Sequence, residues 1–351
     1  MSESAPATGP APASGSSPAC GPSAASGPSA DGPVPADPFP PEPALTARRS
    51  SLGALHGEAF AAAQREVMTG DGRDPRHPAA VIPAVAVADL MAAFGLASVE
   101  EAMVLALEPA RALARPPISR YHVGAVGLAA ASGDLLLGGN LELPGAAIWQ
   151  TVHGEGFVTL LARARGERLS TLLITQARPC AHCRQVLSEI EGGAGLLVID
   201  PAGRRLRLAD LYPWPFAPGD LGMAGALPDR VSFADLALAD PTVPAAVAAA
   251  LVAAGRRAHA PYSGVAAAVV VRLRDGSLVA GTVLESVAFN PTIGPAQDAL
   301  VGALAAGHDW TGIEAAWIAV PRSASVNHEA PARDALAAAA PGIAPETTYW
   351  S

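Results

Sequence analysis

Residues 151–200 read TVHGEGFVTLLARARGERLSTLLITQARPCAHCRQVLSEIEGGAGLLVID. The helical pattern that spans 146–165 is followed by a short apolar run from Leu169 to Thr175. A second helical pattern runs from Cys180 to Ile190, and another apolar run covers Gly195 to Ile199. Helices that alternate with short buried strands indicate an α/β fold in which helices pack against a central sheet.

Three side chains in this stretch are suited to hold one metal ion. Cys180 and Cys183 lie three residues apart in the first turn of the predicted helix, so both thiols point the same way. Pro179 suits that turn because it has no N–H to leave unpaired, and the helix N-terminus favours thiolates. His153, near the start of the preceding helix, adds a third ligand. Because three protein ligands leave the fourth tetrahedral position for water, the set predicts a catalytic zinc site.

Glu155 is the predicted catalytic base beside this metal. It lies two residues after His153, close enough to reach the water without being a ligand. Zinc lowers the pKa of bound water from about 16 towards neutral, and a carboxylate then accepts the proton readily. This H-x-E…P-C-x-x-C pattern is the recorded signature of zinc deaminases. The alternative for the two cysteines alone is a thioredoxin-like redox pair, and His182 between them is predicted to point away from the metal.

The chain before this stretch changes its periodicity twice. Residues 1–48 are almost wholly Pro, Ala, Ser and Gly, a composition that cannot offset its ordering entropy, and we predict that they are disordered. From Leu52 to about Leu113 the pattern is helical, with a stop at Gly95 and a capping box from Ser98 to Glu101. Apolar runs at 121–130 and 135–137 flank a Ser-Gly-Asp turn and predict a β-hairpin.

The second half repeats this order, with a hairpin at 262–284, a helix at 293–306 and a strand at 314–320. Tyr121 to Glu155 spans 34 positions and Tyr262 to Gln297 spans 35, which indicates an internal duplication. In this pairing Pro295 replaces His153 and Gln297 replaces Glu155, so the second copy lacks a zinc site. We predict a tail (1–48), a helical N-terminal segment (49–115), a catalytic zinc domain (116–222) and a degenerate second domain (223–351).

Composition excludes several classes of function. The formal net charge is -9 and no basic stripe is present, so a nucleic-acid partner is not expected. The chain has no lysine, which excludes Schiff-base catalysis. No apolar run is long enough to cross a bilayer and no secretory signal is found, so we expect no membrane association and a cytoplasmic location. Three cysteines, with Cys20 in the tail, do not form a disulfide framework.

With these motifs the chain resembles the two-domain homodimeric cytidine deaminases over roughly residues 52–340. The resemblance implies a three-layer α/β/α cytidine-deaminase-like sandwich, duplicated, with a helical N-terminal segment. It implies one Zn²⁺ per chain on His153, Cys180 and Cys183, with Glu155 as proton shuttle. It also implies a homodimer, in which the degenerate domain helps to complete the partner's pocket, and a place in pyrimidine salvage.

The resemblance assigns five residues to the substrate. Asn140 and Glu142 match the family's Asn-x-Glu, which holds the ribose hydroxyls, and Tyr121 stands where the family has a phenylalanine against the pyrimidine. Phe216 and Phe289 are similar to the family's aromatic contributions to the pocket. From the residues alone, Asn140 equally suits a turn and Tyr121 could be an ordinary core residue, while a core position is favoured for Phe216 and Phe289.

The implied reaction converts cytidine or 2′-deoxycytidine to uridine or 2′-deoxyuridine and releases ammonia. Four positions depart from the family pattern, namely His122, Gly154, Gly156 and Arg178. An arginine beside the amine pocket would either recognise an added carboxylate or phosphate, or turn outward to pair with an acid. Two alternatives therefore stay open: a deaminase of a modified pyrimidine nucleoside or nucleotide in secondary metabolism, and a non-catalytic, zinc-stabilised ligand-binding scaffold.

Overall fold

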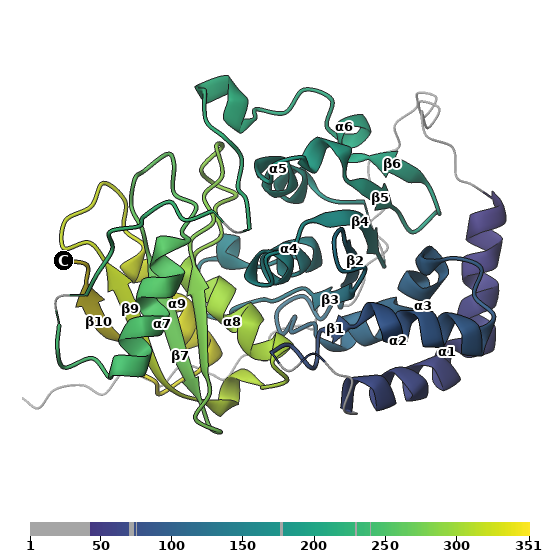
Figure 1. Ribbon diagram of the computed structural model, residues 1–351, viewed down its shortest axis with the longest axis horizontal. Helices are drawn as coiled ribbons and strands as arrows, with labels where there is room; N and C mark the ends of the chain where they lie inside the picture. The colour runs from purple at the N-terminus through teal and green to yellow at the C-terminus, as the bar shows by residue number, and fades with distance from the viewer. Residues whose placement is uncertain (1–42, 70–73, 75, 176–177, 229, 239) are drawn as a thin grey trace, which may run out of the picture. The chain divides into compact units, whose positions relative to one another are not determined.

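The structure of this chain is a computed structural model that describes residues 43–69, 74, 76–175, 178–228, 230–238 and 240–351 (Figure 1). Most of the predicted tail, including Cys20, lies outside the described residues. The described residues form two β-sheets, each with helices packed against it. The predicted α/β class is therefore confirmed.

The first sheet includes β4, the strand that precedes Cys180 and Cys183 in the chain. Its strand order is β1-β3-β2-β4-β5-β6, and β2 pairs antiparallel with both β3 and β4. The pair β4 and β5 is parallel and is connected through helix α5, Ala181–Glu189. The strands are β1 (Val81–Ile82), β2 (Gly124–Ala129), β3 (Leu135–Gly139), β4 (Leu169–Ile174), β5 (Leu197–Ile199) and β6 (Arg205–Arg207).

Helices cover both faces of this sheet because small residues on the strands let them approach closely. A Cβ at Gly124 would lie 2.7 Å from the carbonyl oxygen of Leu107 in α3 (Val99–Ala112). On the other face, a Cβ at Gly138 would lie 2.9 Å from Cδ1 of Phe157 in α4 (Gly154–Ala164). The sheet is thus the middle layer of the predicted three-layer α/β/α sandwich, with α3 and α4 on opposite faces (Figure 1).

The N-terminal helical segment begins earlier than predicted. Helix α1 spans Pro43–Thr69, so residues 43–48 are helical although we assigned them to the tail. Proline suits a helix start, and the helix is held by side chains that a composition argument overlooks. Phe60 is buried, and the Arg48 guanidinium pairs with Glu101 of α3 at 2.8 Å.

The predicted stop at Gly95 is confirmed, whereas the predicted capping box forms only in part, because the Glu101 carboxylate accepts from the N–H of Ala97 and not from that of Ser98. Helix α2 spans Ala84–Phe94 and ends at Gly95, whose φ of 59° is left-handed. The side chain of Ser98 accepts a hydrogen bond from the backbone N–H of Glu101 at the start of α3. No single helix among the described residues has the length and apolar composition of a membrane span, and only the pair α2 and α3, bent by 100°, meets those criteria together.

The second sheet repeats the topology of the first. Its order is β10-β9-β7-β8, with β7 antiparallel to β8 and β9 and with β9 parallel to β10. The same strand pairs in the first sheet are β2 with β3, β2 with β4, and β4 with β5. The elements are α7 (Ala245–Arg256), β7 (Ala268–Leu273), β8 (Leu278–Thr282), α8 (Pro295–Ala305), β9 (Ile313–Val320), α9 (Glu329–Ala339) and β10 (Glu346–Tyr349).

Hydrogen bonds in the two repeats correct the pairing that we predicted. The bridge between Leu141 and Val152, just before α4, has its counterpart between Leu284 and Ile293, just before α8. His153 therefore corresponds to Gly294, rather than to Pro295, and Glu155 corresponds to Ala296, rather than to Gln297. The error arose because the loops of the two repeats differ in length, which a count of residues along the chain does not reveal.

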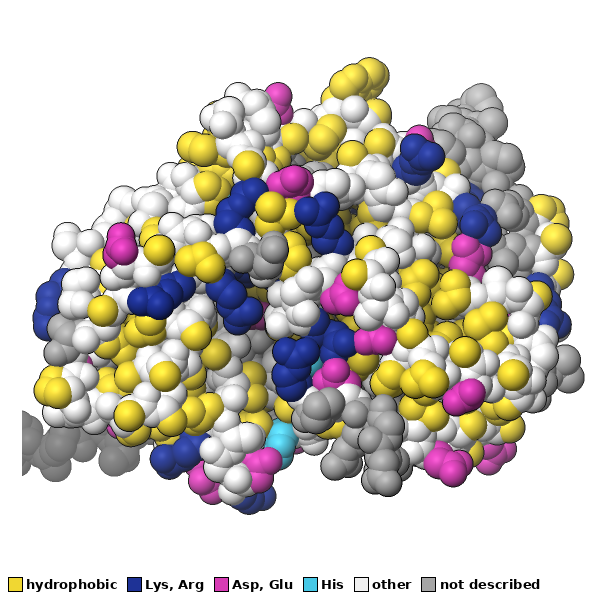
Figure 2. Space-filling view, in the orientation of Figure 1, with side chains coloured by type: hydrophobic (Ala, Val, Ile, Leu, Met, Phe, Trp, Pro, Cys, Tyr) yellow, Lys and Arg dark blue, Asp and Glu magenta, His cyan; other side chains and the backbone are white. Residues whose placement is uncertain are grey.

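The remaining short elements connect these layers. They are α6 (Leu208–Leu211) and the 3₁₀ turns η1 (Ile148–Gln150), η2 (Gly193–Gly195), η3 (Pro218–Leu221) and η4 (Trp310–Gly312). Figure 2 shows one face of the molecule, on which Arg side chains are separated by apolar and acidic ones.

Candidate active site

His153 lies at the N-terminus of helix α4, and the structure explains why the helix begins there. We predicted a helix from Ala146, but residues 146–153 contain only the 3₁₀ turn η1 followed by extended backbone. Val152 exchanges two backbone hydrogen bonds with Leu141, at 2.9 and 2.7 Å, and this pairing keeps the chain extended. His153 is consequently the N-cap of α4, with φ −80° and ψ 161°.

Cys180 occupies the same position on helix α5. Its backbone is extended, and its Sγ accepts a hydrogen bond from the backbone N–H of Cys183 at 3.5 Å. Sulfur here takes the role that a hydroxyl or carboxylate oxygen usually has at an N-cap. Cys183 lies in the first turn and is buried, whereas Cys180 is exposed. Both predicted cysteines therefore share one helix end.

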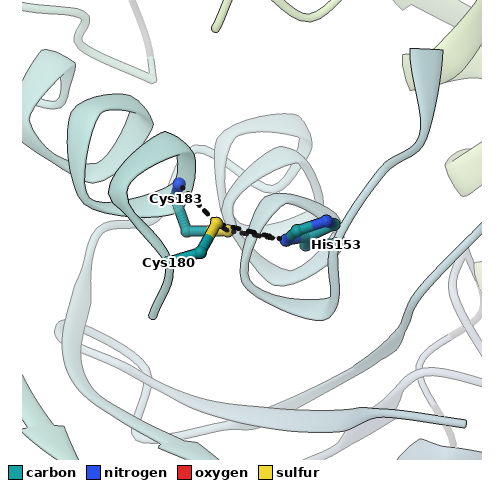
Figure 3. A group of neighbouring side chains, drawn as sticks. All are labelled: His153, Cys180 and Cys183. Atoms are coloured by element: carbon teal, nitrogen blue, oxygen red, sulfur yellow. Dashed lines mark hydrogen bonds between the residues drawn. The ribbon is translucent and has the colours of Figure 1, made fainter. Parts of the chain in front are cut away.

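The three side chains meet between the ends of the two helices (Figure 3). The Nδ1 atom of His153 lies 3.5 Å from Sγ of Cys180 and 3.2 Å from Sγ of Cys183, and the two sulfur atoms are 3.6 Å apart. Zn–S bonds of about 2.3 Å and Zn–N bonds of about 2.0–2.1 Å require ligand atoms about 3.5–3.8 Å apart in a tetrahedron. The donor set fits zinc, and two of the three distances lie within this range.

The electrostatics of this cluster also suit a cation. Hydrogen bonds from Cys183 and His153 lower the pKa of the Cys180 thiol to about 3, which favours the thiolate that binds metals. Burial raises the pKa of the Glu155 carboxyl, which is only 5% exposed. The hydrogen bond with Cys180 is the largest cause that raises the pKa of His153, and the negative charge of Glu155 raises it further. Glu155 is therefore within electrostatic reach of the cluster.

Comparison with known proteins gives the family. Two regions, 97–196 and 208–333, match the cytidine and deoxycytidylate deaminase zinc-binding region. A cytidine deaminase from Serratia proteamaculans is 36% identical over 241 residues, which are 68% of this chain and 80% of the relative. The chain belongs to the cytidine deaminase family. A second relative, the cytidine deaminase from Klebsiella pneumoniae, is 36% identical over 254 residues, 72% of this chain and 83% of its own length.

Among solved structures, a cytidine deaminase from Mycobacterium tuberculosis is 35% identical, covers 31% of this chain and 89% of its own, and has a TM-score of 0.28. Family membership and the His/Cys/Cys cluster make zinc the cofactor. Within the described part of the chain, His153, Cys180 and Cys183 are the one cluster of three or more potential ligands. The second repeat matches the family without such a cluster.

Asn140, Glu142 and Tyr121 come together at the end of strand β3. The Asn140 side chain accepts from the backbone N–H of Val123 at 2.9 Å and donates to the carbonyl of Tyr121 at 2.9 Å. Glu142 accepts hydrogen bonds from the loop at Ile118 and Ser119, and its charge also raises the pKa of His153. Tyr121 is 53% exposed. Their predicted contacts with substrate stay predictions.

Phe216 and Phe289 are both exposed, and each lies in a segment that is hydrogen-bonded to helix α5. Gln185 of α5 donates its side-chain amide to the carbonyl of Phe216 at 2.7 Å. Phe289 lies on the loop between β8 and α8, and the N–H of Val287 in that loop donates to the buried carboxylate of Glu189 in α5 at 2.9 Å. Phe216 and Phe289 are 45% and 65% exposed, so the core position that the residues alone favoured for both is wrong.

Two contributions of the second repeat were missed by sequence reasoning. Gln297 donates to the carbonyl of Gln150 at 2.8 Å, which fixes the segment just before His153. Thr292 and Ile293 line a small cavity of about 10 Å³ together with His153 and Cys183. The Pro-Ala-Gln sequence at the start of α8 could have indicated that this helix packs against the site, because α8 has the same place in the second repeat as α4 has in the first.

The Arg178 side chain forms an ion pair with an acidic residue. Its Nε lies 3.2 Å from Oδ2 of Asp200, which also pairs with Arg204 at 2.9 Å. Asp200 is almost fully buried, and these arginines help to hold the pKa of its carboxyl below the usual range against the effect of burial. Of the two roles considered for Arg178, pairing with an acid is the one observed.

Proposed function

We propose that this protein catalyses the zinc-dependent hydrolytic deamination of cytidine and 2′-deoxycytidine, producing uridine or 2′-deoxyuridine and ammonia. The observation that carries the proposal is the convergence of His153, Cys180 and Cys183 within 4.8 Å of one another, with Glu155 beside them, in a member of the cytidine deaminase family. Two relatives of 36% identity are named cytidine deaminases.

In this proposal His153, Cys180 and Cys183 hold the zinc and Glu155 moves the protons. When bound, zinc supplies a Lewis acid that makes water nucleophilic near neutral pH. Glu155 takes one proton from the attacking water and delivers it to ring N3 as the water oxygen bonds to C4. Its carboxyl then carries the second proton to the amine, the C4–N bond breaks, and ammonia leaves.

Asn140 and Glu142 are proposed to hold the sugar and Tyr121 to pack against the pyrimidine. The support is their meeting at the end of β3, with the charge of Glu142 acting on His153. Because the Arg178 guanidinium pairs with Asp200, it is not the basis for a substrate with an added anionic group at the amine. Unmodified cytidine is therefore the first substrate to test.

The experiment measures ammonia and uridine from purified, zinc-loaded protein given cytidine or 2′-deoxycytidine, with Glu155→Ala as the matched control. Equal amounts of ammonia and uridine from the wild type, and none from the variant, are expected. Silence of both proteins despite bound zinc would remove the proposal and leave the scaffold alternative.

We further propose that the protein is a homodimer in the cytoplasm. Ile148, Trp149 and Phe289 are 81%, 58% and 65% exposed, and the last two line a cavity of about 500 Å³. Large exposed apolar side chains around a hollow are typical of an interaction surface. Analytical ultracentrifugation should give twice the mass of one chain, and Trp149→Asp should shift the mass towards one chain. A wild-type protein with the mass of one chain would contradict the proposed homodimer.

A further inference from the structure

A cavity of about 160 Å³ is lined by the C-terminal halves of helices α4 and α5. The metal ligands lie at the N-terminal ends of the same two helices, which pack against each other (Figure 1). None of the residues that line this cavity also lines the small cavity beside His153 and Cys183. The larger cavity is therefore separate from the candidate active site, and we call it the Arg163 cavity after its buried arginine.

The walls of the Arg163 cavity are mainly apolar. They come from both helices, from the start of strand β4 and from the loops that follow α5. An apolar cavity of about 150 Å³ is large enough to hold a molecule of benzene. The space therefore suits a small ring or a short hydrocarbon chain. Its apolar lining includes Ala162, Leu169, Leu187, Ile190, Leu196 and Ala226.

Arg163 adds a buried positive charge to these walls. It is only 8% exposed, its Nη2 donates to the carbonyl of Arg257, and its Nε has no hydrogen-bond partner in the described structure. Burial lowers the pKa of the Arg163 guanidinium, and the charge of Asp298 opposes this effect only in part. The Asp298 carboxylate instead accepts from the N–H of Thr282 at 2.8 Å. Since a buried donor without a partner is costly, Nε of Arg163 favours a ligand that brings an acceptor.

The acidic side chains at the rim of the cavity have donors of their own. Glu167 accepts from the N–H of Ala131 at 3.3 Å, and Glu191 pairs with Arg230 at 3.3 Å. Arg168, which also lines the cavity, adds a second positive charge at the rim. Both Arg168 and Glu191 are exposed, so the rim faces solvent and gives a ligand a path of entry.

We propose that the Arg163 cavity binds a small monocarboxylate with an apolar body, of the size of benzoate. The carboxylate accepts a hydrogen bond from Nε of Arg163, and the apolar body packs between Ala162 and Leu187. Hydrogen bonds between a guanidinium and a carboxylate are among the stronger ones in proteins. Apolar walls disfavour a strongly hydrated inorganic anion, because its remaining oxygens would lose their water without gaining donors. This binding site is independent of the proposed deamination.

The test measures binding of benzoate, benzyl alcohol and acetate to the zinc-loaded full chain by isothermal titration calorimetry. We expect a Kd of about 1 mM or lower for benzoate. The other two should bind at least about tenfold more weakly, because benzyl alcohol lacks the charge and acetate lacks the apolar body. Arg163→Gln should remove the preference for benzoate and change the Kd of benzyl alcohol less than about threefold, since the apolar walls remain.

A second pair of variants locates the ligand, because carboxylates are also ligands of zinc. Ala162→Met extends a flexible apolar side chain into the Arg163 cavity and should weaken benzoate binding at least about tenfold. Ala164→Met is the matched control, since Ala164 is an exposed residue of α4 that does not line this cavity. It should keep the Kd of the wild type. The midpoint of thermal unfolding shows that both variants are folded.

Three results would overturn the proposal. Equal affinity of the wild type for benzoate and benzyl alcohol would show an apolar cavity without an anion site. Benzoate binding that persists in Ala162→Met would place the ligand at the zinc or elsewhere on the molecule. Absence of benzoate binding to the wild type would remove the site altogether. All three results concern binding alone, so they leave the proposed deamination standing, and loss of deamination would leave this site standing.

Discussion

The metal ligands depend on two helix N-termini that meet. His153 and Cys180 are both N-caps, so each side chain leaves its helix at the point where unpaired N–H groups favour negative charge. The spacing of Cys180 and Cys183 could be interpreted from sequence because residues three apart in a helix share a face. The contact with His153 could not be derived from spacing alone, because it requires α4 and α5 to lie on the same face of the sheet.

Substitution of one thiol should release the metal. Because Cys183 is buried and only 3.2 Å from Nδ1 of His153, Cys183→Ser should weaken zinc binding by at least about 100-fold. Cys20→Ser is the matched control, since it removes the remaining cysteine and should keep one zinc per chain. Metal content after dialysis against a graded chelator measures both. Equal retention of zinc by Cys183→Ser and the wild type would reject Cys183 as a ligand.

The surroundings of the proposed substrate residues could be predicted only in part from the sequence. Asn140 and Glu142 were assigned by resemblance to the sugar, and the structure gives each of them internal partners in the loop that contains Tyr121. Those partners lie about twenty positions earlier in the chain, and no local pattern predicts the contact. The same holds for the ion pair between Arg178 and Asp200, which joins the start of α5 to the end of β5.

At the scale of elements, helix ends and the hairpins were predictable and the start of α4 was not. Gly95 and Ser98 act within one turn of chain, so their capping roles follow from sequence. Helix α4 begins at Gly154 because Val152 pairs with Leu141, which belongs to another segment. The duplication was also predictable, although its pairing was wrong by one position at the catalytic helix.

One buried carboxylate of helix α5 forms hydrogen bonds with the second repeat. Glu189 is fully buried and accepts hydrogen bonds from Nε2 of His259 at 2.7 Å, the hydroxyl of Tyr262 at 2.5 Å and the N–H of Val287 at 2.9 Å. All three donors belong to the second repeat, and the last precedes Phe289. The degenerate repeat therefore supports the helix that carries Cys180 and Cys183.

Glu189→Ala should destabilise the fold by about 3–5 kcal/mol, because it leaves buried donors without an acceptor. Glu191→Ala is the control two residues further on. Its carboxylate is about half exposed and pairs with Arg230 at 3.3 Å, so its loss should cost less than about 1 kcal/mol. Urea unfolding monitored by circular dichroism measures both free energies. Similar values for the two variants would show that Glu189 does not join the repeats.

The whole molecule should be less stable in mild acid because of a partly buried histidine. Burial lowers the pKa of His77 from its ordinary 6.5 to about 4, against the opposing charge of Asp74. The unfolded chain therefore binds this proton first, so the contribution of His77 is complete above about pH 6.5 and is lost as the pH falls towards about 4.

Replacing His77 should reduce this dependence on pH. Between pH 7 and pH 5 the wild type should lose about 1–2 kcal/mol more of its free energy of unfolding than His77→Gln does. Urea unfolding at the two pH values provides the comparison. Losses of the same size in both proteins would mean that His77 is not buried in its neutral form.

The most direct test of the account separates metal binding from proton transfer in one variant. Glu155→Gln keeps the size of the side chain and leaves His153, Cys180 and Cys183 in place, so it should retain one zinc per chain. The same preparation should lose at least about 100-fold in kcat for cytidine, because the amide cannot carry the proton. Zinc content and ammonia release are measured together on wild type and variant. Near wild-type turnover in a zinc-loaded Glu155→Gln protein would contradict the role given to Glu155.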